Sequence, residues 1–255
     1  MKALTTFASA AVIALSISAA AIPAHAAVFA QFDPNTNTSD YKWVVGASGL
    51  GGSFFSVNGN TDTSAQGVDV QFSFIEPTFD ALHDLDATFT INATAASNQL
   101  ASEGSAGTWT QPGLTGDFSL IYNGPDQTIG AFSLTTGENL LSGNFANAWI
   151  QGAGGTGSTN VTIGNGGSAT YTSSVINFSN VVPGSEEFAF NLGSVNPHFG
   201  ANPNKSLNSF TANGGGNFSA LGVPEPATWG LMIIGFGGMG ALLRSNRRRQ
   251  AIATA

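Results

Sequence analysis

The densest cluster of residues able to do chemistry places four ionisable side chains within seven positions: Asp80, His83, Asp84 and Asp86. Carboxylates suit hard cations such as Ca²⁺ and imidazole suits Zn²⁺, so these residues are weak candidates for a metal site. Their spacing matches neither an EF-hand nor a zinc motif, and the glycine that a tight calcium loop requires is absent. We therefore expect a solvated connection before a strand, with no metal and no other cofactor.

The rest of the chain offers little nucleophilic or acid–base chemistry. Nucleophilic catalysis needs a serine or cysteine, a base and an orienting group. The chain has no cysteine and no G-x-S-x-G sequence, and beyond residue 26 its only imidazoles are His83 and His198. A glycosidase would need only two suitably spaced carboxylates, and the sequence does not exclude such a pair. We expect no enzymatic activity, with a glycoside-active enzyme as a less favoured alternative.

The C-terminal segment, residues 223–255, carries a different kind of signal. A Pro-Glu-Pro sequence precedes an uncharged apolar run over residues 227–243, and a basic cluster follows: Arg244, Arg247, Arg248 and Arg249. As a helix the apolar run would span about 25 Å, the short end of what a bilayer requires. Trp229 lies near one end, where indole favours the membrane boundary, and the arginines should hold residues 244–255 in the cytoplasm. We expect a transmembrane helix in contact with lipid rather than a core helix.

These residues resemble the PEP-CTERM sorting signal, in the variant with a tryptophan three residues after the second proline. The match comprises Pro224-Glu225-Pro226, Trp229, Met232, Gly235-Phe236-Gly237 and Gly240, followed by the arginines. In that family an exosortase, a membrane transpeptidase-like protease, reads the signal and removes the tail during export. The resemblance implies that Pro224, Glu225 and Pro226 are the recognition element and that an exosortase is a partner. The same tail is also labelled an ice-binding protein C-terminal domain.

The N-terminal segment has the order of a secretory signal peptide. Lys2 precedes an apolar run over residues 8–22, and Ala24-His25-Ala26 supplies the small residues that a signal peptidase inspects. This pattern predicts cleavage between Ala26 and Ala27, with the signal peptidase and the export machinery as partners. Residues 1–26 would then be removed, leaving residues 27–222 outside the inner membrane as a single domain.

The charge of the body, residues 27–222, restricts its partners. Of seven Lys and Arg residues, five lie in the terminal segments, leaving Lys42 and Lys205; of fifteen acidic residues only Glu225 lies outside, leaving fourteen. The body therefore carries a net charge of −12, from 2 minus 14. Phosphate binding needs clustered cations, so a nucleic-acid partner is not expected.

The body shows the period-two alternation of half-buried strands. Val68 to Phe74, Ala87 to Ala93 and Phe118 to Tyr122 alternate apolar and polar residues, and clusters of Gly, Pro and Asn separate the candidate strands. Further candidates are 41–47, 53–57, 107–111, 129–134, 144–150, 160–163, 169–178 and 187–192. The pattern predicts an all-β fold, with a single β-sandwich or jelly-roll-like body.

Residues 196–222 give two interpretations. They could form a last hairpin, with 207–210 pairing with 217–221 around Gly214–Gly216. They could instead be a flexible tether that lifts the body off the membrane. We favour the hairpin slightly, because Phe210 and Phe218 are costly to leave in water.

The sequence predicts an exported protein of structural or interaction type. Its precursor would be anchored in the inner membrane and then delivered to the cell surface, outer envelope or extracellular matrix, with exopolysaccharide as a further partner. A secreted carbohydrate-binding module is the alternative, in which Trp43, Trp109 or Trp149 would stack on sugar rings. Each of these tryptophans sits among apolar residues, so core filling is the favoured role. An ice-binding function is less favoured, because the T-x-T triplets at 88–90, 108–110 and 170–172 lack regular spacing.

Overall fold

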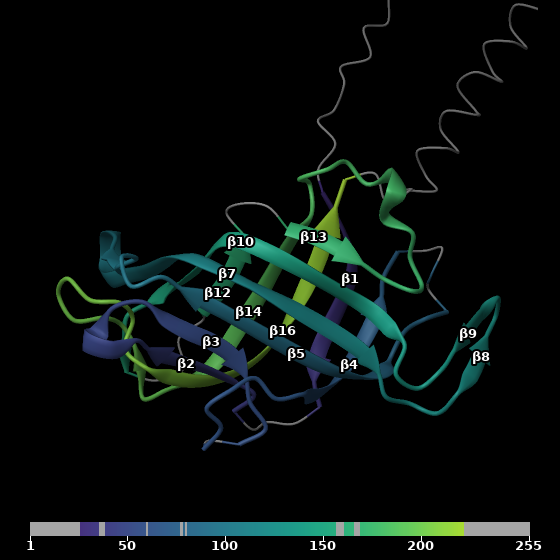
Figure 1. Cartoon of the computed structure of the whole chain (residues 1–255), viewed down its shortest axis with the longest axis horizontal. Coiled ribbons are helices and arrows are strands. Elements are labelled where there is room, and N and C mark those ends of the chain that lie inside the picture. The colour runs from purple at the N-terminus through teal and green to yellow at the C-terminus, as the bar shows by residue number, and fades with distance from the viewer. Residues whose placement is uncertain are drawn as a thin grey trace, which may run out of the picture.

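The structure is a computed structural model that describes residues 26–35, 39–59, 61–76, 79, 81–156, 161–165 and 169–221. These residues form an all-β body, which confirms the predicted class (Figure 1). The strands are β1 (Ala27–Pro34), β2 (Tyr41–Val45), β3 (Gly52–Ser56), β4 (Val68–Phe74), β5 (Leu85–Ala95), β6 (Ser102–Glu103), β7 (Thr108–Tyr122), β8 (Gln127–Ile129), β9 (Phe132–Leu134), β10 (Asn139–Ala153), β11 (Gly155–Thr156), β12 (Val161–Asn165), β13 (Ala169–Thr172), β14 (Glu187–Asn196), β15 (His198–Phe199) and β16 (Phe210–Ala220).

The described ranges contain no α-helix. Their helical turns are three 3₁₀ segments, η1 (Ala47–Gly49), η3 (Ser105–Gly107) and η4 (Phe178–Asn180). None of these helices has the length and apolar character needed to cross a bilayer. The predicted signal peptide and the predicted transmembrane helix both fall outside the described residues.

The main sheet closes on itself. Its antiparallel pairings lead from β1 through β4, β5, β7, β10, β12, β14 and β16 and back to β1. A second bridge joins β16 to β5 through β2 and β3. Strands β1 and β4 use the last residues of β16 and the first of β5, whereas β2 and β3 use the opposite ends. The sheet therefore runs from β16 to β5 by two routes. One passes through β1 and β4 at one end of the body, and the other passes through β2 and β3 at the opposite end.

The closed sheet folds into two layers around an aromatic core. In Figure 1, β10, β7 and β5 cross in front of β14, β16 and β1. Between the layers the ring of Phe32 stacks on Phe89 with centroids 4.5 Å apart, and Phe118 stacks on Phe218 at 5.0 Å. The core phenylalanines are almost completely buried. Such crossed layers are consistent with a β-sandwich.

The strongest alternation in the sequence gives the best-predicted strands. β4 has the bounds that the pattern predicts, with Val68, Val70, Phe72 and Phe74 buried and the intervening residues turned outward. In β5 the buried and accessible residues alternate over the whole strand. The prediction of one strand over residues 129–134 is wrong, because a turn at Gly130 and Ala131 divides this segment into the end of β8 and β9. The strand predicted at 169–178 is shorter than expected, since β13 ends at Thr172.

Within the described residues 196–221, the chain forms neither the predicted hairpin nor a tether. Phe210 to Ala220 is one continuous strand, β16, which pairs with β14 on one side and with β1 and β2 on the other. The glycine run fits there because side chains would collide with neighbouring backbone at Gly214 and Gly215 and with aromatic rings at Gly216. A Cβ atom at Gly216 would lie 2.2 Å from Cδ1 of Phe190 and 2.8 Å from Cε1 of Phe32. The glycines therefore allow close packing against the strand, with core rings over Gly216, instead of making a turn.

Candidate functional site

The two ends of the body meet. Ala27, the first residue of β1, lies opposite Ala220, the last residue of β16, and the antiparallel pairing continues to Phe32 and Gly216. On its other edge β1 pairs with β4, so the first strand lies between two neighbours. The predicted signal-peptidase cut, between Ala26 and Ala27, thus falls beside the end of the last strand. Ala24 lies outside the described residues.

The predicted sorting residues begin just beyond this junction. Pro224, Glu225, Pro226, Trp229 and the four arginines Arg244, Arg247, Arg248 and Arg249 lie outside the described residues, which end at Leu221. An extended chain covers at most about 3.6 Å per residue. Pro224 is therefore within roughly 14 Å of Ala220, because it follows Ala220 by four positions. The body and the Pro-Glu-Pro sequence are neighbours along the chain, with no long linker between them.

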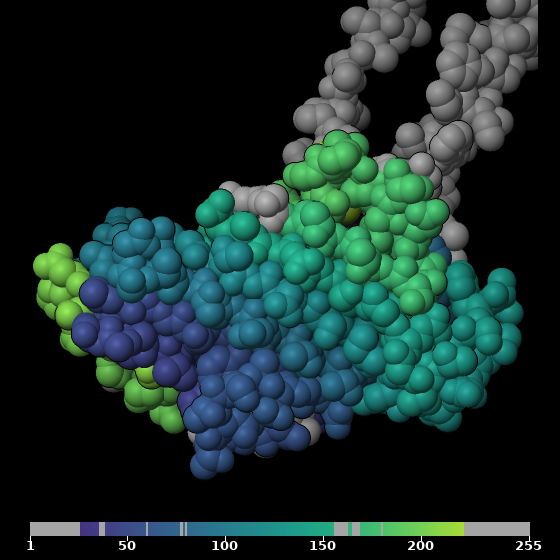
Figure 2. Space-filling model, viewed as in Figure 1, coloured from purple at the N-terminus to yellow at the C-terminus, as the bar shows by residue number. Residues whose placement is uncertain are grey.

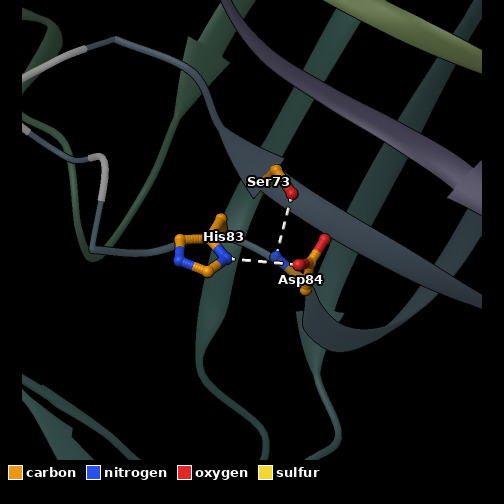
Figure 3. A network of polar contacts seen from close by, with 3 residues as sticks. All are labelled: Ser73, His83 and Asp84. Atoms are coloured by element: carbon orange, nitrogen blue, oxygen red, sulfur yellow. Dashed lines mark hydrogen bonds and ion pairs between the residues drawn. The ribbon is translucent and has the colours of Figure 1, made fainter.

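The predicted metal cluster is spread over an exposed connection (Figure 3). Nδ1 of His83 lies 3.2 Å from Oδ2 of Asp84, and the backbone N–H of Asp84 donates to Oγ of Ser73 at 2.9 Å. The side chains of His83 and Asp84 are 63% and 81% exposed, and Asp86 instead accepts a hydrogen bond from Gln71. Asp80 lies outside the described residues. Within the part of the chain that the structure describes, no three His, Cys, Asp or Glu side chains form a group able to hold a metal.

The three tryptophans of the body have different environments. Trp43 is fully buried, and its Nε1 donates to the carbonyl oxygen of Leu207 at 2.9 Å. Trp109 is half-buried and packs against the core. Trp149 is also half-buried, but it alternates with the buried residues of β10 and lies over Gly164 of β12, so it faces outward. Core filling is confirmed for Trp43 and does not apply to Trp149.

The outer face of β5, β7, β10 and β13 carries a polar row that sequence reasoning missed. Strand register places Asn92, Asp117, Asn144 and Thr170 opposite one another on these four strands, and all four are exposed. Asp117, Asn144 and Thr170 help to line a shallow depression of about 430 Å³. Figure 2 shows this face, over β5, β7 and β10, as a broad surface. Alternation predicts that such residues point outward, but only the register shows that they are neighbours.

Comparison with known proteins identifies the segment that follows β16. Residues 222–249 match the model of the PEP-CTERM protein-sorting motif. The chain carries a PEP-CTERM sorting motif. This motif implies export, a membrane-anchored precursor and processing by an exosortase on the way to the cell surface. No curated protein and no solved structure matches the chain.

The PEP-CTERM motif and the body are directly continuous. The motif starts two residues after Ala220, the end of β16, and Leu221 is tied back to the body. Its carbonyl oxygen accepts a hydrogen bond from the N–H of Val182, and its N–H donates to Oγ of Ser185. The sorting motif therefore leaves from an ordered edge of the sheet, beside the residue at which the predicted signal peptide ends.

Proposed function

We propose that the chain is the precursor of an exported structural or interaction protein that an exosortase delivers to the cell surface or the exopolysaccharide matrix. The observation that carries this proposal is the PEP-CTERM motif at residues 222–249, placed directly after the last strand of a self-contained β body. The pairing of Ala27 with Ala220 supports it, because both export segments then attach to one edge of that body.

In the proposed route the N-terminal segment directs export, and the C-terminal segment anchors the chain and directs its processing. The export machinery moves the chain, and a signal peptidase cuts between Ala26 and Ala27. Residues 227–243 then span the inner membrane, with the arginines on the cytoplasmic side. The exosortase recognises Pro224, Glu225 and Pro226 and cuts nearby, which releases residues 27–222 with their fold intact.

A non-enzymatic role for the body rests on the environment of its histidines. His83 is exposed and contacts the carboxylate of Asp84, and His198 is exposed on β15. Among the described residues neither imidazole forms a hydrogen bond with a serine or threonine side chain, so no nucleophile–base pair is assembled there. We expect the purified body to hydrolyse no polysaccharide, ester or peptide.

The sorting step can be tested by changing the recognition element. Replacement of Pro224, Glu225 and Pro226 by alanine should leave the uncut precursor in the inner-membrane fraction. Replacement of Asn202 and Pro203, two exposed residues of the body, by alanine is the matched control and should leave processing unchanged. Normal release of the Pro-Glu-Pro variant to the cell surface would contradict the proposal.

A second candidate function is carbohydrate binding by the outer face of β7, β10 and β13. The polar row around Asp117 and Asn144 supports it, because carboxylates and amides bind sugar hydroxyls well. Both side chains are exposed and help to line the shallow depression. Trp149, further along β10, adds an outward-facing ring on which a sugar could stack.

A glycan array that includes the producing organism's exopolysaccharide tests this candidate. If the face binds sugar, Asp117→Ala, Asn144→Ala and Trp149→Ala should each reduce binding while the circular dichroism spectrum stays unchanged. Gln31→Ala, at an exposed position on β1, should leave binding intact. Absence of binding by the unmodified protein, or equal loss in the Gln31 variant, would rule out a specific site on this face.

A further inference from the structure

Exposed apolar side chains gather at the edge where the body ends. Among the described residues, five large apolar side chains are strongly exposed: Val28, Val44, Ile75, Leu100 and Val182. Val28, Ile75 and Val182 lie next to the junction of β1 and β16, with exposed fractions of 42%, 41% and 51%. We call these three residues the terminal rim.

Backbone contacts place the three residues of the terminal rim along one edge. Val28 lies opposite Ser219, two residues before Leu221. The N–H of Ile75 donates to the carbonyl oxygen of Phe29 at 2.9 Å, and the N–H of Val182 donates to that of Leu221 at 2.9 Å. In Figure 1 the start of β1 and the yellow end of β16 converge beside the light-green segment that follows β13. The terminal rim thus surrounds the point at which the sorting motif begins.

The charges near the terminal rim permit an apolar contact but do not favour an electrostatic one. Both lysines of the body lie elsewhere: Lys42 pairs with Thr211 at the far end of β16, and Nζ of Lys205 donates to the carbonyl oxygen of Ser48. Glu186 is buried, and its carboxylate accepts a hydrogen bond from the N–H of Gly184 at 2.9 Å. The exposed Glu187, opposite Ser219, limits the contact to a shallow one.

Chain length keeps this edge near the membrane in the precursor. Residue 227, where the apolar run begins, follows Ala220 by seven positions, so the edge lies within roughly 25 Å of that run even if the chain is extended. Any folding of the residues between these positions shortens the distance. The edge that holds the terminal rim is thus tethered within this distance of the bilayer.

The geometry points to a lipid-contacting surface: in the anchored precursor, the terminal rim rests on the bilayer at the boundary between headgroups and acyl chains. This inference depends on the proposed membrane anchoring of residues 227–243. Three side chains form a small patch, so the contact depends on the anchor and ends when the exosortase removes it. While it lasts, the contact holds the Pro-Glu-Pro sequence between the body and the membrane, in reach of a membrane protease.

Single cysteines can test this contact, because the chain has none of its own. The anchored precursor is purified from cells without an exosortase, as Val28→Cys, Val182→Cys and Val44→Cys variants. Each carries a fluorophore and is reconstituted in phosphatidylcholine vesicles that contain nitroxide-labelled lipid. Val44 is the matched control: it is 36% exposed and lies on β2, which pairs with the opposite end of β16. Thermal melts establish that each variant is folded.

The inference predicts several-fold stronger quenching by nitroxide lipid at positions 28 and 182 than at position 44. Addition of anionic lipid or of salt should change the quenching little, because no lysine faces the membrane there. Equal quenching at the three positions in a precursor that stays with the vesicles would overturn the rim contact while leaving the anchoring intact. A precursor that does not stay with the vesicles would instead contradict the proposed anchoring.

Discussion

Ala27 and Ala220 are strand partners, although they are the first and last residues of the regular structure. The pairing means that β1 cannot acquire its neighbour on this side until β16, the last strand of the body, has been exported. Closure of the sheet is therefore linked to export of the residues that directly precede the sorting motif. The folded state then holds both chain ends at one edge.

An engineered disulfide should confirm the pairing of the two ends. Opposite residues of antiparallel strands have Cα atoms about 4.5–5.5 Å apart, within the range that a disulfide spans. The Ala27→Cys, Ala220→Cys variant, exported to an oxidising compartment, should form one intramolecular disulfide, detectable by a mass lower by two hydrogens and by gel mobility. The control pairs Ala27→Cys with Ala212→Cys, which lies at the other end of β16 opposite Tyr41. Equal disulfide formation in the two variants would contradict the register.

The glycine run of β16 should be sensitive to added side-chain volume. Gly216→Ala places a methyl group against Phe190 and Phe32, so one of these core rings must shift. We expect a loss of roughly 1–3 kcal/mol in the free energy of unfolding, measured by urea denaturation. Gly59→Ala is the control: the nearest neighbour of its new Cβ would be Oδ2 of Asp62 at 3.8 Å, and its stability should change little. Equal effects at the two positions would argue against close packing over β16.

The contrast between β4 and β16 shows how far local sequence determines this fold. In β4 each large apolar residue from Val68 to Phe74 occupies an inward position, so period two alone predicts the strand. In β16 the residues between Ala212 and Phe218 include three consecutive glycines, which local propensity assigns to a turn. The rings of Phe32 and Phe190, which are distant in sequence, pack against this strand at Gly216. Only tertiary packing makes this segment a strand.

The candidate sites also differ in how far local sequence predicts them. The terminal motifs, from Ala24 to Ala27 and from Pro224 onward, depend on residue order within short windows, so the sequence is sufficient to predict them. Their adjacency is not predictable, because it depends on pairing between the first strand and the last. The polar row around Asp117 was missed for the same reason. Trp43 was expected in the core, whereas the outward position of Trp149 follows from the strand register.

Two buried tyrosines should respond differently to loss of their hydroxyl groups. The hydroxyl of Tyr41 is buried, and the described residues provide it with no hydrogen-bond partner, whereas the hydroxyl of Tyr171 donates to the carbonyl oxygen of Glu187. Tyr41→Phe should therefore raise the free energy of unfolding by about 1 kcal/mol, and Tyr171→Phe should lower it by about 1 kcal/mol. Urea denaturation of both variants provides the measurement. A loss of stability in Tyr41→Phe would indicate that its hydroxyl has a stabilising partner.

The same tyrosines should make the body sensitive to alkali. Burial raises the pKa of Tyr41 and of Tyr171 above the ordinary value of 10.0, and nearby carboxylates add to the effect, Asp40 for the first and Glu186 and Glu187 for the second. Below about pH 10 both residues are protonated in the folded and the unfolded states, so their ionisation takes nothing from the free energy of unfolding.

Above about pH 10 the unfolded chain loses these protons and the folded body does not, so stability should fall as the pH rises. Melting temperatures measured from about pH 8 to about pH 11 should decline less in the Tyr41→Phe, Tyr171→Phe double variant than in the unmodified protein. Parallel declines in the two proteins would show that these tyrosines do not control alkaline stability.

The intact mass of the envelope-associated protein tests the central claim most directly. In cells with an active exosortase, the protein should begin at Ala27 and should lack the apolar run and the arginines beyond the Pro-Glu-Pro sequence. In cells without an exosortase it should retain them and stay in the inner membrane. Recovery only of a surface form that still contains Arg249, with the exosortase present, would contradict the account.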